Sequence, residues 1–441
     1  MQTLSRRQFL RLGGFTVVGA ALAACAAPTA PASAPAASSG GGEAAAPAAA
    51  PVELSISVVD YAPPTQELLD KELLPAYTDA NVSVNYTAWN RYNEEMTTAF
   101  AGGVTPDVFQ GGAVWAPQMA HRGWAAALDD YIAASGDWNW EDWFPALRDD
   151  VTIDGKVVGV PYRIDIRSFW YRKYHLGDAG ITAPTNWEEL RDAAIALTQR
   201  DGDKIVREGY HYSSPGGWQN DLQPYMFFME MAGGQFLSDD LKSCTLDSDA
   251  CIEAMTFIHQ LVVEDQVQPY PGFEAQGDLG PLEGGLASMT ISNESPERNA
   301  RLYAPEELDN LVVTLPLKHK VQATHVWVNK WFISSQSKAP DAAWGLLAYL
   351  TNQANLEKYA ASGNYTPPRA SLGNASFMTD AMKTLLASTK YANPYPKYWR
   401  LLELFRPFAT QLELCLSGKQ SPEDTMLNTC KEIDAILAED A

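Results

Sequence analysis

The apolar and polar positions along the chain change their period several times after residue 51. Residues 52–59 alternate and then become wholly apolar, which is typical of a strand entering a sheet, and residues 82–86 predict a second strand. Helical patterns over residues 65–77 and 90–101 surround the second strand, and a short third strand is expected from residues 106–109. Strands that alternate with helices indicate parallel sheets covered by helices, so the pattern predicts an α/β fold.

Further helices are expected along the rest of the chain. Thr185 and Glu188 have the spacing of a capping box at the start of a helix. Residues 249–263 and 339–350 carry apolar residues at helical spacing, and Ser421 followed by Pro predicts the start of the last helix. Beyond the first segment, no stretch of the sequence predicts a membrane span or an internal repeat.

The first 25 residues predict export from the cytoplasm. Residues 5–11, Ser-Arg-Arg-Gln-Phe-Leu-Arg, look like a twin-arginine motif, and the apolar residues 12–22 are too few for a stable membrane span. The string Leu-Ala-Ala-Cys at residues 22–25 resembles a bacterial lipobox, so residues 1–24 read as a signal peptide and Cys25 as the lipidation site. A plain signal peptide with an incidental Cys is the alternative, and the export route, twin-arginine or general, stays open.

Residues 25–51 predict a lipid anchor followed by a flexible linker. From residue 26 onward this stretch is almost wholly Ala, Pro, Gly and Ser, and it has too few bulky apolar residues to fold. Its Pro-rich patches favour extended backbone. A tether between the lipid and the folded body suits a protein that must reach both a solute and a membrane partner.

The length and the charge of the chain limit its architecture and its partners. The 441 residues exceed the usual size of one hydrophobic core, which predicts two lobes. The chain has 32 basic and 54 acidic residues, and three of the Arg lie in the signal peptide, so the mature protein has a net charge of -25. Nucleic acid is excluded as a partner, because its phosphates require a basic surface.

Four cysteines remain once Cys25 is assigned to the lipid. An even number of cysteines in an exported chain predicts disulfides, and four cysteines allow three pairings. The local pairs Cys244–Cys251 and Cys415–Cys430 are expected, because each pair flanks a loop between predicted elements. Four free buried thiols are the alternative. The sequence has no paired Cys-x-x-Cys spacing, so no zinc site is expected, and no cofactor motif is visible.

Motifs in six successive segments, over residues 52–441, have the order and spacing of a known family. These segments lie at residues 89–109, 123–132, 154–190, 233–269, 282–289 and 333–368. The strongest runs from Asp154-Gly155-Lys156 through Gly159-Val160-Pro161-Tyr162 to Tyr171-Arg172-Lys173. In these residues the chain resembles the extracellular solute-binding protein family 1, which includes maltose-binding protein. Arg172 stands where the family usually has Asn, and Trp331 stands where a small residue is common; both departures bear on ligand choice.

The resemblance implies a type II periplasmic-binding-protein fold, with two α/β lobes, a hinge and an interlobe cleft. Lobe 1 would hold residues 52–164 and 327–367, and lobe 2 would hold residues 165–326 and 368–441. A ligand would bind between the lobes, and hinge closure would bury it.

The resemblance also implies a function. The protein would be a monomer on the outer face of the cell membrane. It would capture a mono- or oligosaccharide without altering it and without a cofactor, and it would deliver this ligand to the permease subunits of an ABC importer.

Candidate ligand contacts follow from the chemistry of sugars, which have hydroxyls at their edges and C–H patches on their faces. Such a site needs planar polar side chains and aromatic platforms, and in α/β sheets it lies beyond the carboxyl ends of strands. Residues of these types at expected strand ends, on crossing segments and in one loop are Asp60, Tyr61, Gln110, Trp115, Arg163, Asp165, Arg167, Trp218, Gln219, Asn293, Glu294, Trp327, Asn329 and Trp331.

Several candidates have an equally good structural interpretation. Arg163, Asp165 and Arg167 alternate, so they share one face of an expected crossing segment, where they line a cleft or form an internal ion network. The two Arg also suit an anionic ligand such as a uronate or a phosphorylated solute, because a guanidinium matches the geometry of a carboxylate. Asp60 would cap a turn or bind a hydroxyl, and Trp115 would pack beneath a helix or contact the ligand.

An exported glycosidase is the alternative function, since it would also be acidic and rich in aromatic residues and would use two carboxylates. The sequence has no Gly-x-Ser-x-Gly elbow, no His-Glu-x-x-His motif and no phosphate-binding loop, and its six His are scattered. No metal site is therefore expected. A cell-surface adhesion module is a third class, and it predicts no small-ligand cleft.

Overall fold

The computed structural model describes residues 51–60, 62–213 and 219–440, and for residues 219–221 it describes the backbone alone. Several predictions concern residues outside this range. They are the signal peptide, the twin-arginine motif, Cys25, the linker up to residue 50, Tyr61, Trp218 and the side chain of Gln219.

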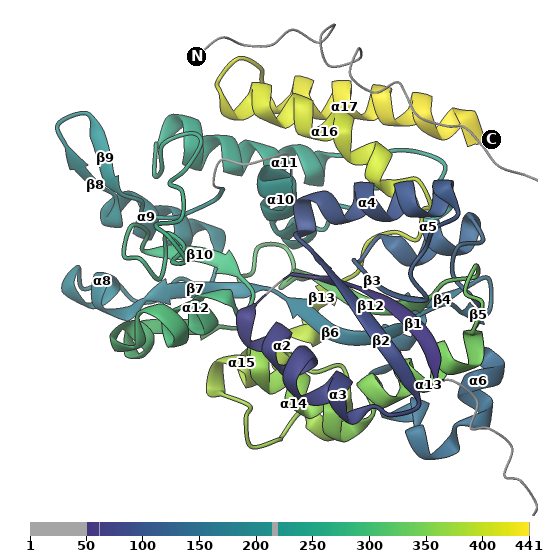
Figure 1. The fold of residues 1–441 in the computed structure, drawn as a ribbon. Helices are drawn as coiled ribbons and strands as arrows, with labels where there is room; N and C mark the ends of the chain where they lie inside the picture. Colours follow the sequence, from purple (N-terminus) through teal and green to yellow (C-terminus); the bar gives the residue numbers. More distant parts are fainter. Residues whose placement is uncertain (1–50, 61, 214–218, 441) are drawn as a thin grey trace, which may run out of the picture. The chain divides into compact units, whose positions relative to one another are not determined.

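In the described part of the chain, six strands form the larger sheet (Figure 1). Its path is β13 (Ala392–Asn393), β12 (Thr324–Ile333), β3 (Val108–Gly111), β1 (Val52–Val59) and β2 (Ala80–Thr87), and β6 (Val160–Ile166) also pairs with β12. β1 is parallel to β2 and β3, whereas β12 is antiparallel to β3 and β6. The strand predicted over residues 52–59 is confirmed at both ends, and the next two predicted strands are confirmed within two residues.

Helices cover both faces of the larger sheet, as the alternation of strands and helices predicts. On one face, Ile56 and Val58 of β1 belong to a core shared with α13 (Pro340–Thr351) and α14 (Gln353–Gly363). On the other face, Phe109 and Phe332 pack against α4 (Trp89–Gly102) and α5 (Trp115–His121). Two shorter helices of this region are α6 (Asp129–Ala134) and α7 (Pro145–Asp150), and a small hairpin pairs β4 (Thr152–Ile153) with β5 (Lys156–Val157).

The helix predicted over residues 65–77 is confirmed, but it is not regular. It consists of α2 (Pro63–Leu68), a π turn at Leu69–Leu73 and α3 (Leu74–Ala76). Pro75 explains the irregular turn, because its ring clashes with the carbonyl four residues earlier and its nitrogen has no hydrogen to donate.

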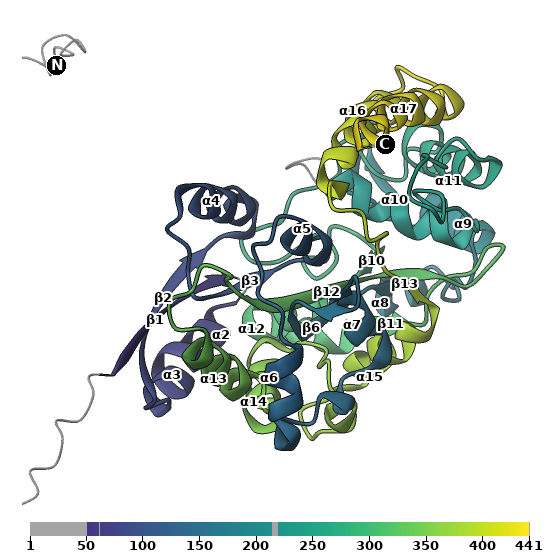
Figure 2. The same cartoon turned by 90° about the vertical axis from the view of Figure 1, so that its right-hand side faces the viewer.

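A second sheet and a second group of helices follow β6. β7 (Ser168–Arg172) lies between β10 (Met289–Ser292) and β11 (Leu311–Thr314), and a hairpin pairs β8 (Gln199–Asp201) with β9 (Lys204–Arg207). The helices are α8 (Lys173–Asp178), α9 (Trp187–Leu197), α10 (Gln219–Met231), α11 (Asp249–His259), α12 (Ser295–Tyr303), α15 (Asp380–Ser388), α16 (Leu401–Leu416) and α17 (Pro422–Leu437). Figure 2 shows α10, α11, α16 and α17 as one group, and their buried residues share one large core. The lobe boundaries expected from the sequence stay a prediction.

The starts of two helices test the capping predictions. Ser421 caps α17 by accepting a hydrogen bond from the backbone of Asp424, as predicted. The expected Thr185–Glu188 box is wrong by one residue, because Asn186 is the N-cap of α9 and accepts from the backbone of Glu189. Thr185 instead donates from its hydroxyl to the Glu189 carboxylate.

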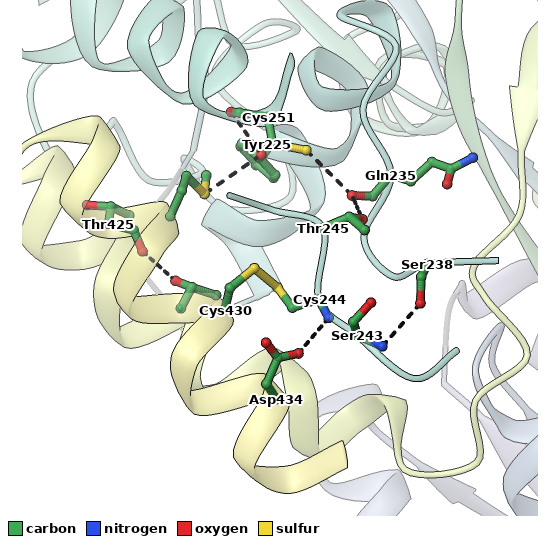
Figure 3. Close-up of a disulfide and its surroundings, with 12 residues drawn as sticks. Tyr225, Gln235, Ser238, Ser243, Cys244, Thr245, Cys251, Thr425, Cys430 and Asp434 are labelled. Atoms are coloured by element: carbon green, nitrogen blue, oxygen red, sulfur yellow. Dashed lines mark hydrogen bonds between the residues drawn. A yellow bond between two sulfur atoms is a disulfide. The ribbon is translucent and has the colours of Figure 1, made fainter. Parts of the chain in front are cut away.

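The disulfide in the structure joins Cys244 to Cys430, so both expected local pairs are wrong (Figure 3). The two residues are 186 positions apart, but their Cα atoms lie 5.1 Å apart, because the loop before α11 packs on α17. The backbone of Cys244 donates to Asp434 of α17 at 2.7 Å, which fixes that loop. Cys251 and Cys415 are free thiols buried in the helices α11 and α16.

Among the described helices, none is both long and apolar enough to cross a bilayer.

A count of reactive thiols distinguishes the observed Cys244–Cys430 disulfide from the two expected local pairs and from four free thiols. We expect protein that starts after Cys25 to react with a thiol reagent only after denaturation, and then at two sites, because Cys251 and Cys415 are buried. The local pairs would give no reactive thiol under non-reducing conditions. Cys430→Ser should add the thiol of Cys244 to the count and lower the free energy of unfolding by about 2–4 kcal/mol.

Candidate functional site

A cavity of about 910 Å³ is lined by residues from both groups of elements. The first group contributes α4, α5 and the loop between β3 and α5, and the second contributes α10, α16 and α17. Figure 1 shows α4 and α5 on the side of the larger sheet that faces α16. Among the residues that the structure describes, the aromatic ones that line the cavity are Trp89, Trp115, Trp327, Tyr395 and Phe405. Its polar lining residues are Asn90, Asn93, Glu94, Gln118, Gln223, Glu403 and Arg406.

The aromatic wall of this cavity is held by contacts behind it. The indole nitrogen of Trp327 donates to the Tyr395 hydroxyl at 3.1 Å, with the two rings nearly perpendicular. Tyr395 packs against Phe405 at 5.3 Å between ring centroids. On the opposite side, Trp115 packs against Tyr92 in the core below α4. These contacts fix the orientation of the rings before any ligand arrives.

A buried lysine supports the loop that lines the cavity between β3 and α5. Lys330 of β12 is fully buried, and its ammonium donates to the carbonyl of Ala113 and to the Asp150 carboxylate. Burial lowers the pKa of Lys330, and the negative charge of Asp150 opposes this shift. Because Ala113 lines the cavity, Lys330 ties the cavity wall to the larger sheet.

A smaller and more polar cavity of about 280 Å³ adjoins the first. Gln223 lines both cavities. The polar residues around the smaller cavity include Arg167, His211, Glu283 and Asn299. His211 is held by the buried Glu208, whose carboxylate lies 2.5 Å from its Nδ1. The two cavities together offer aromatic faces on one side and hydrogen-bonding groups on the other.

The three alternating charged residues, Arg163 and Asp165 on β6 and Arg167 directly after it, form an ion network, which was one of the two interpretations of their spacing. Arg163 is buried, and its Nη2 donates to Glu294 at 2.5 Å. Asp165 accepts from the Nε of Arg167 at 3.3 Å and from Asn293 at 3.1 Å. Burial alone would raise the pKa of Asp165, but the charges of Arg167 and Arg163 outweigh it and hold this pKa below its usual value.

Residues 59–357 of the sequence match the model of a known family. The chain belongs to the bacterial extracellular solute-binding protein family. The diacetylchitobiose binding protein DasA of Streptomyces coelicolor is 30% identical over 142 residues, which are 31% of this chain and 32% of that protein. The alignment thus spans about a third of the length of this curated relative.

Solved structures of solute-binding proteins confirm the predicted fold. An ABC transporter solute-binding protein from Thermotoga lettingae, bound with alpha-D-tagatose, aligns with a TM-score of 0.78 and 22% identity over 88% of this chain and 100% of its own. A substrate-binding protein from Listeria monocytogenes in complex with cycloalternan aligns with a TM-score of 0.77 and 21% identity over the same shares. The fold is therefore the two-lobed α/β fold of type II periplasmic binding proteins.

This solute-binding protein brings only some of the candidate ligand contacts to its cavities. Trp115 and Trp327 line the larger cavity, and Arg167 lines the smaller one. Asp165 lies directly behind Arg167 and opposite Trp327 in the pairing of β6 with β12. Three residues of the candidate set thus line the two cavities, and a fourth, Asp165, contacts one of them.

Other candidates have structural partners and line neither cavity. Gln110 is fully buried, where it accepts from the backbone of Val59 and donates to the Tyr359 hydroxyl. Trp331 packs in the core, and exposed Asp60 accepts from Gln66. Three further candidates are buried, namely Asn293, Glu294 and Asn329. Asn293 accepts from the backbone of Ser295, and Glu294 accepts from Arg163 and Arg298. Asn329 lies opposite Arg163 in the register of β12 with β6. We leave these residues out of the site.

Sequence reasoning missed part of the cavity lining. Trp89, Tyr395, Phe405 and Gln223 were not candidates, although all four line the larger cavity. Trp89 stands in the first family motif and carried a signal that could have found it. Tyr395 lies in a stretch without helical or strand periodicity, so its sequence gave no such signal.

Replacing Glu294 tests the ion network that supports the site. Glu294→Gln removes the carboxylate closest to the buried charge of Arg163, so we expect the free energy of unfolding to fall by about 3–5 kcal/mol. Urea-induced unfolding measures the change. Glu141→Gln is the matched control, because the Glu141 side chain pairs with Arg148 but is 75% exposed, and it should change stability by less than about 0.5 kcal/mol. Equal effects of the two variants would contradict the network.

Proposed function

We propose that this protein captures a carbohydrate outside the cell and delivers it, chemically unchanged, to the permease of an ABC importer. The observation that carries the proposal is the cavity of about 910 Å³, whose described lining combines aromatic residues with amide and charged side chains. Flat apolar rings suit the C–H faces of a sugar, and the amides of Asn90, Asn93, Gln118 and Gln223 suit its hydroxyls.

The position of the cavity supports a role in hinge closure. Its lining residues come from α4 and α5 on one side and from α10 and α16 on the other. A ligand that contacts both sides stabilises the state in which the two sides are close together. The shift is as large as the difference in the ligand's binding free energy between the closed and the open state. Such closure would present the loaded protein to the permease.

The ligands of similar proteins support a carbohydrate. Those named for relatives and solved structures are diacetylchitobiose, alpha-D-tagatose and cycloalternan. They differ in size, so they support the class of ligand and not one sugar.

The N-terminal sequence supports a location on the outer face of the membrane. We propose that the chain is exported, that lipid is attached to Cys25, and that residues 26–51 link the anchor to the folded monomer. The tether would let the protein reach both the solute and the permease.

Sugar binding without turnover is the decisive expectation. A panel of neutral mono- and disaccharides, screened by thermal shift and then by calorimetry, should contain a ligand that raises the melting temperature in a saturable manner. Trp89→Ala should weaken the affinity for that ligand by about tenfold or more, because the half-buried Trp89 ring lines the cavity. Trp140→Ala is the matched control, since Trp140 is also half-buried but packs against Trp138 and Trp143.

The same experiment separates the binder from a glycosidase. Chromatography of the incubated sugars should recover them intact. Release of shorter products by the wild-type protein would contradict the proposal and favour the enzyme, and loss of binding in Trp140→Ala but not in Trp89→Ala would contradict the proposed site.

The anchor has its own test. Cys25→Ser removes the thiol that would take the lipid, so we expect the exported protein to move from the membrane fraction to the soluble fraction with unchanged affinity for its sugar. Immunoblots of the fractions measure the change. Membrane association that persists in Cys25→Ser would contradict lipid anchoring at this residue.

A further inference from the structure

The charges that line the two cavities do not favour an anionic ligand. Among the described residues, the ionised side chains around the larger cavity are Glu94, Glu403 and Arg406. Those around the smaller cavity are Arg167 and Glu283. His211 is held 2.5 Å from the buried carboxylate of Glu208, so it is not an isolated cation for a ligand. The part of the lining that the structure describes therefore has no excess of positive charge for a carboxylate or phosphate group.

Arg167 is the arginine that lines the smaller cavity, and two contacts hold it. Its Nε donates to the Oδ1 of Asp165 at 3.3 Å, and its guanidinium lies 4.5 Å from the centre of the Trp327 ring. Its terminal Nη groups make no hydrogen bond to any residue that the structure describes, and the side chain lines the smaller cavity. Arg167 can therefore donate to a ligand while its charge is already balanced.

Arg163 does not supply a second cation for the ligand. Its Nη2 donates to the fully buried Glu294, it lies over the Tyr365 ring at 4.4 Å, and it lines neither cavity. The nearest carboxylate oxygen of Asp165 is 3.9 Å away. Glu294 is shared by Arg163 and Arg298, whereas the arginine closest to Asp165 is Arg167, whose charge it offsets.

We propose that Asp165 is a positioning residue that determines specificity: by pairing with Arg167 from behind, it makes this arginine a donor for the hydroxyls of neutral sugars and excludes uronates and phosphorylated sugars. The inference rests on the proposed carbohydrate function. An anionic ligand brought to Arg167 would also approach Asp165, and close like charges repel strongly in a site removed from water. A hydroxyl accepts from the Nη groups without that repulsion.

The geometry explains why Asp165 can act without touching the ligand. Asp165 faces Trp327 in the register of β6 with β12, and Arg167 stacks on the same Trp327 ring. Asn293 donates a second hydrogen bond to the carboxylate. Asp165 is therefore fixed beneath Arg167, and the low pKa of its carboxyl keeps it charged at neutral pH.

Asp165→Asn tests the inference, because it keeps the shape of the side chain and removes its charge. The probes are matched pairs: glucose and glucuronate, galactose and galacturonate, and α-1,4-linked galactobiose and digalacturonate. We expect the wild-type protein to bind only neutral members. Asp165→Asn should raise the affinity for at least one anionic member by about tenfold or more, with a strong dependence on salt, and change the affinity for neutral members much less.

Three further variants exclude a purely structural effect of the substitution. Asp165→Glu keeps the charge and should keep the selectivity for neutral sugars. Arg167→Gln combined with Asp165→Asn should abolish the gain for anions, because the released guanidinium is absent. Asp239→Asn removes the same charge from an exposed position and should leave the selectivity unchanged. Melting temperatures confirm that each variant is folded.

The outcomes separate this inference from the proposed function. Wild-type protein that binds the anionic members as well as the neutral ones overturns the inference alone, as does Asp165→Asn with unchanged selectivity. Absence of binding to every neutral sugar, in this set and in the wider panel, overturns the proposed function and the inference with it.

Discussion

The burial of charged residues on β6 is the constraint on which the candidate site depends. β6 is the last strand of the larger sheet before the chain enters the smaller sheet at β7, and Arg163 on it is only 2% exposed. A buried guanidinium is tolerated only with a well-placed partner, and Glu294 supplies it from the start of α12. The requirement to pair one charge therefore joins the crossing strand to a helix of the second group.

The chain directly after this strand reaches the smaller cavity at Arg167. Asp165 and Arg167 follow Arg163 on one face, and the pairing of β6 with β12 brings Trp327 opposite Asp165. Trp327 in turn donates to Tyr395, so an ion pair, a stacked guanidinium and an indole hydrogen bond form one connected set. Because each member is held by another, the ligand meets groups already in place, which lowers the entropy lost on binding.

The sequence predicts the parts of this arrangement that depend on local periodicity. The strand over residues 52–59, the helix over residues 90–101 and the contact between the alternating charges of Asp165 and Arg167 all follow from the spacing of side chains. The fold follows from family motifs whose order spans the folded chain. The Cys244–Cys430 disulfide does not follow, because its partners are 186 residues apart and only the packing of the helices brings them together.

The difference between local spacing and long-range packing also explains why the alternation of Arg163, Asp165 and Arg167 left two interpretations open. A period of two shows that Arg163 and Arg167 share a face, but whether their charges are available depends on carboxylates that sequence spacing does not locate. Glu294 is 131 residues away from Arg163, whereas Asp165 is two residues from Arg167 and could have been paired with it from the sequence. Counting arginines near a cleft thus overestimates its affinity for anions, and only the pairing of each one shows what charge a ligand meets. The net charge of the whole chain says even less about the charge that a ligand meets, since screening confines the influence of exposed charges to about 10 Å at ordinary ionic strength.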